Sequence, residues 1–301
     1  MNLLYSAMLA KADPSQVEGL ARFFKTGPGQ YGYGDKFLGI KVPVTRAVVK
    51  DCWRSVGFPE LEECISSEYH EVRLAALLTL VEIFRHAGKK SPAPVPSSCP
   101  ATALSSCPAT TGHLQQQCVE FYLAHTDFIN NWDLVDLSCY PLLGQWLLDK
   151  DRTLLYNLAR SGRTIWEQRI GMVSTMTFVR HGQLQDTFAL ADILLHHPHD
   201  LIHKAVGWLL REAGKRDKAA LEAWLRGTPG PAGGDDGGRT SGANGNVGAT
   251  GATGGEGGSV MPGHDRTVLP GSNRASQMPR TMLRYAIEKF PEAERKAYLA
   301  P

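Results

Sequence analysis

Apolar residues along this chain recur every three to four positions, the spacing of α-helices that bury one face. The pattern predicts helices over residues 2–11, 14–25, 44–56, 59–66, 69–87, 114–125, 131–148, 152–160, 164–181, 184–196, 199–215, 218–226, 279–290 and 292–299. No convincing pair of β-strands is evident. Local signals agree at residue 14, because Asp13 can cap a helix whose first residue is Pro14. We therefore predict an all-α fold.

Three of the predicted helices contain one seven-residue pattern at a constant step. The segments are NWDLVDL from Asn131, EQRIGMV from Glu167 and HKAVGWL from His203, so 167 − 131 and 203 − 167 both equal 36. Related segments are EVRLAAL from Glu71 and RTMLRYA from Arg280. Such periods are typical of helical solenoids, in which equivalent faces of stacked repeats form one continuous surface. The sequence therefore predicts an α-α superhelix.

Two compositionally distinct stretches lengthen the spacing of the repeat, one between Glu71 and Asn131 and the other between His203 and Arg280. Residues 89–112 contain SSCPAT twice and are rich in Pro, Ala, Ser and Thr, and residues 228–277 are rich in Gly. Neither stretch has enough apolar residues to form a core of its own. We expect two disordered inserts within a single domain, residues 1–301.

Composition limits the class of protein without identifying it. The net charge is only +2, which is a weak argument for nucleic-acid binding. No run of about 18 uncharged apolar residues is present, so we expect no membrane span. The six cysteines include no CxxC pair, which favours reduced thiols in an intracellular protein, nuclear or cytoplasmic, without a disulfide framework or zinc site.

Two motifs suggest metal or nucleotide binding only weakly. In HHPHDLIH (residues 196–203), His199 and His203 have the spacing of a zinc-binding HExxH helix, but Asp200 stands where that motif has Glu. Glycines at 27, 29, 32 and 34 follow no strand, and the GK[ST] of a phosphate-binding loop is missing. We expect no metal and no cofactor.

The stronger candidate is a set of aromatic and charged residues on one face of the repeat. Trp132 and Asp136 are i,i+4 neighbours, while Arg169 and Trp208 occupy repeat positions on that same face. One interpretation is a binding site on the shared surface. The other is that both tryptophans are core residues, while Asp136 is solvated and paired with Arg169. Spacing alone leaves both interpretations open.

Basic residues extend the same face toward the C-terminus. Lys204 and Arg211 lie on the same side of their predicted helix as Trp208. Together with Arg169 they would form a track for the phosphates of a nucleic acid, with affinity that falls as salt rises.

Several stretches together resemble the AlkD-type family of DNA alkylation repair glycosylases, which are built from HEAT-like helical repeats. They are YGYGDKFLGIKVP (residues 31–43), NWDLVDLS from Asn131, WEQRIGMV from Trp166, HKAVGWLLREAGKRD from His203 and MPRTMLRYAIEKFP (residues 278–291). The resemblance covers nearly everything outside the two inserts.

This resemblance implies a fold and an activity. It implies a HEAT-like solenoid that removes N3- and N7-alkylated purines from double-stranded DNA, as a monomer. Asp136 would be the catalytic carboxylate, Trp132 and Trp208 would flank the deoxyribose, and Arg169 would contact the DNA backbone.

Two rival functions remain. Helical solenoids are common interaction platforms, so one rival is a non-catalytic scaffold that binds DNA structures or a protein. The other is a metal-dependent hydrolase, which would need a bound metal. Asp136 discriminates between these functions, because a pure binding protein needs no unpaired carboxylate facing a polyanion.

Overall fold

The computed structural model describes residues 2–88, 111–228 and 273–300, and within them the chain is helical. The helices are α1 (Leu3–Leu9), α2 (Pro14–Phe23), α3 (Val42–Cys52), α4 (Phe58–Ile65), α5 (His70–Ala87), α6 (Thr111–Ala124), α7 (Trp132–Cys139), α8 (Thr153–Ser161), α9 (Ile165–Val173), α10 (Met176–Arg180), α11 (Gln185–Leu194), α12 (Asp200–Arg216), α13 (Lys218–Arg226), α14 (Arg274–Gln277), α15 (Arg280–Ala286) and α16 (Glu292–Leu299). The described residues form no β-strand, only an isolated bridge between Lys36 and Tyr69. The predicted all-α fold class is confirmed.

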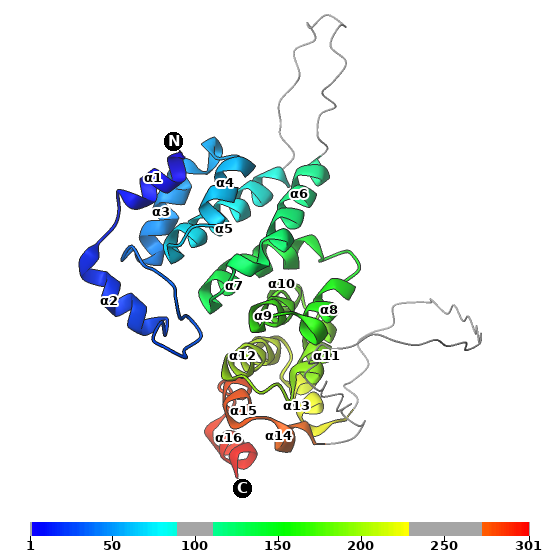
Figure 1. Ribbon diagram of the computed structural model, residues 1–301. Coiled ribbons are helices and arrows are strands. Elements are labelled where there is room, and N and C mark those ends of the chain that lie inside the picture. The colour runs from blue at the N-terminus through cyan, green and yellow to red at the C-terminus, as the bar shows by residue number, and fades with distance from the viewer. Residues whose placement is uncertain (1, 89–110, 229–272, 301) are drawn as a thin grey trace, which may run out of the picture.

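The five repeat segments all lie on one row of stacked helices. These are α5, α7, α9, α12 and α15, which we call the inner row, and each packs against the next. Helices α6, α8, α11 and α13 form an outer layer, on the side away from α2 (Figure 1). The helical-repeat solenoid predicted from the 36-residue step is therefore confirmed.

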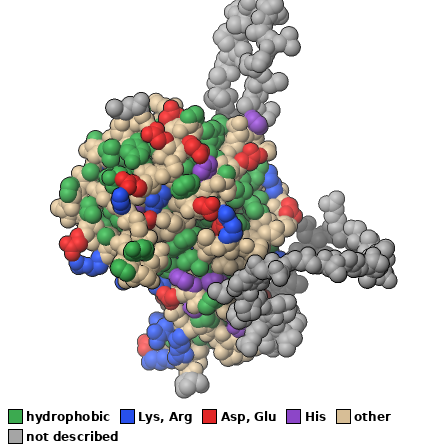
Figure 2. Space-filling model, in the orientation of Figure 1, with side chains coloured by type: hydrophobic (Ala, Val, Ile, Leu, Met, Phe, Trp, Pro, Cys, Tyr) green, Lys and Arg blue, Asp and Glu red, His purple; other side chains and the backbone are tan. Residues whose placement is uncertain are grey.

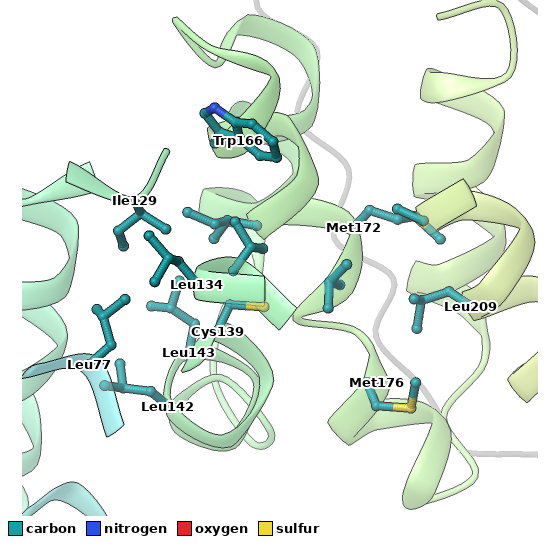
Figure 3. Packing of buried hydrophobic residues seen from close by; sticks show 14 of the residues in the cluster. Leu77, Ile129, Leu134, Cys139, Leu142, Leu143, Trp166, Met172, Met176 and Leu209 are labelled. Atoms are coloured by element: carbon teal, nitrogen blue, oxygen red, sulfur yellow. The ribbon is translucent and has the colours of Figure 1, made fainter. Parts of the chain in front are cut away.

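A continuous apolar core joins successive members of the inner row. Leu134 of α7, Met172 of α9 and Leu209 of α12 are all 0% exposed. Figure 3 shows Leu134 near Ile129 and Leu77, while Met172 and Leu209 lie between α9 and α12. Because each helix buries apolar residues against both neighbours, the repeat is stable only as a stack.

The helix predicted over residues 131–148 is α-helical only as far as Cys139. It runs into a π-helical segment, Tyr140–Gly144, whose second residue is Pro141. Proline has no backbone N–H to continue the α-helical hydrogen bonds. A side chain at Gly144 would lie 2.4 Å from the Ser174 carbonyl oxygen, so the two backbones are in close contact here. The predicted helix is therefore continuous to residue 146, but one turn of it is π-helical.

The helix predicted over residues 164–181 also divides, into α9 and α10. The two helices are separated at Ser174 and Thr175, whose hydroxyls donate to the carbonyls of Ile170 and Met172 at 2.7 and 2.8 Å. Such side-chain bonds compete with the helical pattern and bend or end a helix.

The predicted inserts need correction at their boundaries. Helix α6 begins at Thr111, and α14 lies inside the stretch assigned to the second insert. Arg274 of α14 donates to both carboxylate oxygens of Asp192 on α11, at 2.6 and 3.1 Å, which anchors this segment. The rest of both inserts, residues 89–110 and 229–272, lies outside the described residues.

A long connection between α2 and α3, residues 24–41, is anchored near its end by a buried carboxylate. Glu71 of α5 accepts hydrogen bonds from the backbone N–H groups of Leu38, Gly39 and Ile40, each at 3.0 Å. Gly39 has a φ of +84° and lies so close to the Asp13 carbonyl that no side chain would fit. Three successive N–H groups that could have bound a phosphate therefore bind a carboxylate of the chain itself.

Candidate functional site

Asp136 and Arg169 form a bidentate ion pair between α7 and α9. The Nε and Nη2 atoms of Arg169 lie 2.9 and 2.7 Å from the two carboxylate oxygens of Asp136. The third nitrogen, Nη1, donates to the carbonyl of Leu201 in the first turn of α12. The side chains are 6% exposed for Arg169 and 14% for Asp136. Asp136 is therefore paired, contrary to our sequence expectation that it faces DNA unpaired.

Burial controls the charge of this carboxyl group. Burial raises the pKa of Asp136, and the Arg169 guanidinium opposes that rise. A two-point contact uses one lone pair on each oxygen, so each oxygen can still accept a further hydrogen bond. The paired carboxylate can therefore still orient a water molecule.

Trp132 lies one helical turn before Asp136 on α7, in contact with the end of α2. Its ring centroid is 5.6 Å from that of Phe24, in a stacked arrangement, and 5.8 Å from that of Phe23, edge to face. Phe24 is buried, whereas Phe23 is 59% exposed and Trp132 is only half-buried. The end of α2 thus supplies an aromatic wall against Trp132, one helical turn from Asp136.

Tyr31, in the connection between α2 and α3, adds a hydroxyl to this wall. Its ring lies 5.9 Å from that of Trp166, edge to face. Burial raises its pKa, while the neighbouring Trp132 side chain and the nearby charges of Lys204 and Arg169 oppose the rise. The sequence analysis missed Phe23, Phe24 and Tyr31 as neighbours of the site. The only signal was the YGYG stretch that contains Tyr31, and it gives no distance to residues a hundred positions away.

Trp208 lies on α12, half-buried, where α15 comes close. A side chain on the neighbouring Gly207 would lie 2.6 Å from the Met282 carbonyl oxygen and 2.5 Å from Cβ of Tyr285. Glycine at 207 therefore allows α15 to pack directly against the face of α12 next to Trp208.

The two predicted phosphate-binding residues of α12 differ in their surroundings. Lys204 is 41% exposed and pairs with Asp200 at 2.7 Å, which raises the pKa of its amino group. Arg211 is 20% exposed, and its guanidinium contacts both Glu288 and Glu212. Lys204 is therefore more accessible to a phosphate than Arg211 is. In Figure 2 the densest group of Lys and Arg side chains lies at the lower end of the view, over the C-terminal helices.

A buried polar network lies behind Trp132. His70 of α5 is 1% exposed, with Nδ1 3.1 Å from Asp35 and Nε2 2.9 Å from Asp133. Arg73 donates to Asp35 at 2.7 Å. Burial alone would lower the pKa of His70, but its hydrogen bonds with Asp133 and Asp35 outweigh this effect and raise the pKa to about 9. His70 is therefore an imidazolium at neutral pH.

The histidine-rich segment before α12 has structural roles. His199 caps α12 by accepting from the backbone N–H of Leu201, and His203 Nε2 donates to the His197 carbonyl. Burial lowers the pKa of His197 to about 4, so that ring is neutral. Within the described ranges, no three His, Cys, Asp or Glu side chains are grouped so that they could hold a metal ion.

Other sequence expectations concern cysteines and membranes. Cys52, Cys64, Cys118 and Cys139 are free and buried, while the cysteines at 99 and 107 lie outside the described residues. Among the helices described, none is long and apolar enough to cross a bilayer.

Comparisons with known proteins identify the family. A structure described as a predicted DNA alkylation repair enzyme from Enterococcus faecalis is similar with a TM-score of 0.49 and 15% identity, over 71% of this chain and 88% of that one. No curated protein matches this chain in sequence. The family model for the DNA alkylation repair enzyme matches residues 4–290. Because that match spans nearly the whole sequence, the chain belongs to the DNA alkylation repair enzyme family.

Proposed function

We propose that this protein is a DNA glycosylase that excises N3- and N7-alkylated purines by hydrolysing the N-glycosidic bond, as the first step of base excision repair. The observation that carries the proposal is the Asp136 carboxylate, fixed by Arg169 one helical turn from Trp132. Membership in a DNA alkylation repair family supports it.

The chemistry fits these residue types. Alkylation at N3 or N7 gives the purine a positive charge, so the base leaves readily without a strong acid. The sugar that remains develops oxocarbenium character, which a nearby carboxylate stabilises while it orients the attacking water. Half-buried indole rings at Trp132 and Trp208 would attract the same positive charge and exclude bulk water.

The ion pair changes the role of Arg169. Since the Arg169 side chain is 6% exposed and its guanidinium contacts Asp136 and the Leu201 carbonyl, we propose that Arg169 primarily fixes the carboxylate. A contact with a DNA phosphate through the same side chain remains part of the proposal. Lys204, which is more exposed, is the better candidate for the main phosphate contact on α12.

We propose double-stranded DNA with alkylated purines as the partner, bound by a monomer. The rival function remains a non-catalytic scaffold, because a satisfied Asp–Arg pair also stabilises a protein without chemistry. Sedimentation of the protein with and without a DNA duplex would test the monomer.

The decisive experiment compares release of N3-methyladenine and N7-methylguanine from duplex DNA by the wild type, Asp136→Asn and Asp192→Asn. Asp192 forms the same bidentate pair with Arg274, but on α11 and α14, outside the inner row. Loss of the Asp136 charge should slow excision by roughly 10²–10³-fold. Asp192→Asn should excise at nearly the wild-type rate.

The controls separate chemistry from folding and binding. Both variants break an Arg–Asp pair, so both should lose stability. Similar activity losses in the two variants would mean that the ion pair at Asp136 is only structural. No base release by the wild type, together with intact DNA binding, would favour the scaffold.

A further inference from the structure

We propose that His70 is a positioning residue for this site. Its imidazole bridges Asp35 and Asp133, and we infer that this bridge keeps Trp132 and Asp136, both on α7, in the geometry that the reaction requires. The inference rests on the proposed function for its catalytic meaning. The geometric part of the inference does not depend on the proposed function, because the geometry can be measured in the absence of substrate.

The bridge joins three segments that are distant in sequence. Asp35 belongs to the connection between α2 and α3, His70 is the first residue of α5, and Asp133 is in the first turn of α7. The side chains of Asp35 and Asp133 are each 4% exposed. An imidazolium has two N–H donors on opposite sides of one ring, whereas a neutral ring has only one. Only the charged form can therefore donate to both carboxylates at once.

The same ring is packed between aromatic residues that lead to the site. The His70 ring centroid lies 4.7 Å from that of Phe24 and 4.9 Å from that of Phe37. Phe24 in turn stacks on Trp132 at 5.6 Å. His70 therefore contacts α7 directly through Asp133 and reaches Trp132 through Phe24.

The charged groups facing His70 come from three elements. They are Asp35 from the connection, Asp133 from α7 and Arg73 from α5 itself. Arg73 opposes the charge on His70, yet it also neutralises one oxygen of Asp35 at 2.7 Å. Since two carboxylates face two cations, the network is balanced only while His70 carries its proton. Loss of that proton would leave Asp133 as a buried carboxylate near Asp136, which is unfavourable for both.

The test measures single-turnover excision between pH 7 and 9.5 for the wild type, His70→Gln and His125→Gln. His125 is a matched control, because it also bonds a carboxylate, Glu62, and a backbone carbonyl, that of Phe121, but does so at the end of α6. Wild-type excision should fall as the pH rises through about 9. His70→Gln should be slower by roughly 10–100-fold, the scale of a displacement of about 1 Å at a reacting centre. The excision rate of His70→Gln should also not decrease at alkaline pH. His125→Gln should have the wild-type excision rate and the wild-type decrease at alkaline pH.

A second readout is independent of activity. The emission of Trp132, obtained as the difference between the protein and its Trp132→Phe variant, should change with a midpoint near pH 9. The His70→Gln background should abolish this transition. Inactive wild-type protein with a normal emission transition would refute the proposed function and leave the positioning role intact.

Two results would overturn the inference: a wild-type rate in His70→Gln, or an alkaline fall and emission transition that persist without His70. If His70→Gln does not fold, Asp133→Asn replaces it in the test. That variant keeps the imidazole but removes one of the charges that raise its pKa, so both transitions must move to lower pH. Transitions that stay at the same pH would equally contradict the proposal.

Discussion

Removal of the Arg169 guanidinium tests how the charge of Asp136 is controlled. In Arg169→Gln the carboxyl remains buried but loses its cation and two hydrogen bonds, at 2.9 and 2.7 Å. Burial already raises the pKa of Asp136 above its ordinary value, and Arg169 is the main force that opposes this rise. A neighbouring cation typically lowers the pKa of an Asp by about 1–3 units. We therefore expect the pKa of Asp136 to rise further in the variant.

The shift should be visible in both activity and stability. Excision needs the ionised carboxylate, so the acid side of the excision profile should move by about 1–3 pH units toward neutral pH. A group whose pKa is raised on folding contributes most stability below its unfolded pKa and loses that contribution as the pH rises through the folded value. The stability deficit of Arg169→Gln should therefore be larger at pH 8 than at pH 5. Its size should be up to about 3–5 kcal/mol, the usual cost of leaving one partner of a buried ion pair alone.

The assay is single-turnover release of N7-methylguanine from pH 5 to 9, with depurination in enzyme-free reactions subtracted. Urea unfolding at pH 5 and pH 8 gives the stability. Arg274→Gln is the matched control, because it breaks the other bidentate pair, with Asp192. An acid limb at the wild-type position in folded Arg169→Gln would refute the argument that Arg169 controls the charge of Asp136.

Two further predictions concern the aromatic and basic residues. Trp132→Ala and Trp208→Ala should each slow excision by roughly 2–30-fold, the range of a cation–π contact, and should destabilise the protein less than Trp224→Ala does. Trp224 is 6% exposed, and its loss should cost about 3–5 kcal/mol; equal stability losses in all three variants would favour a core role for the first two. A plot of log affinity for DNA against log salt should have a negative slope, and Lys204→Ala should make that slope less steep by about 0.9. Arg211→Ala should change the slope less, because Glu288 and Glu212 already contact the Arg211 guanidinium. A slope that is the same in Lys204→Ala and the wild type would exclude a phosphate contact at Lys204.

The sequence predicted the inner row well because its signal is periodic. A fixed step, together with apolar residues at helical spacing, identified the segments from Glu71 to Arg280 that stack on one another. Helix ends were less predictable where proline and hydroxyl side chains compete with the helical hydrogen bonds. At Ser174 such competition divided a helix that the apolar pattern alone would continue, and at Pro141 the helix continues as a π-helical turn.

The surroundings of the candidate site were predictable only in part. Shared position in the repeat brought Asp136 and Arg169 onto one face, and pairing between them was one of the two interpretations that spacing left open. Contacts from Phe23 and Tyr31 were not predictable, since the connection that carries Tyr31 reaches α7 through tertiary packing, without a sequence period. The bridge from His70 to Asp35 and Asp133 was missed for the same reason.

The contact of Arg169 with α7 and α12 has a consequence for the cooperativity of unfolding. In a helical-repeat array each repeat normally interacts with its nearest neighbours, so unfolding can begin at an end and proceed one repeat at a time. A side chain on α9 that bonds Asp136 on one side and Leu201 on the other links three successive repeats. These repeats should therefore exchange their amide hydrogens as one unit, while the two ends of the array open independently. Deleting or duplicating a single repeat would then be tolerated near the termini but not in the middle of the array.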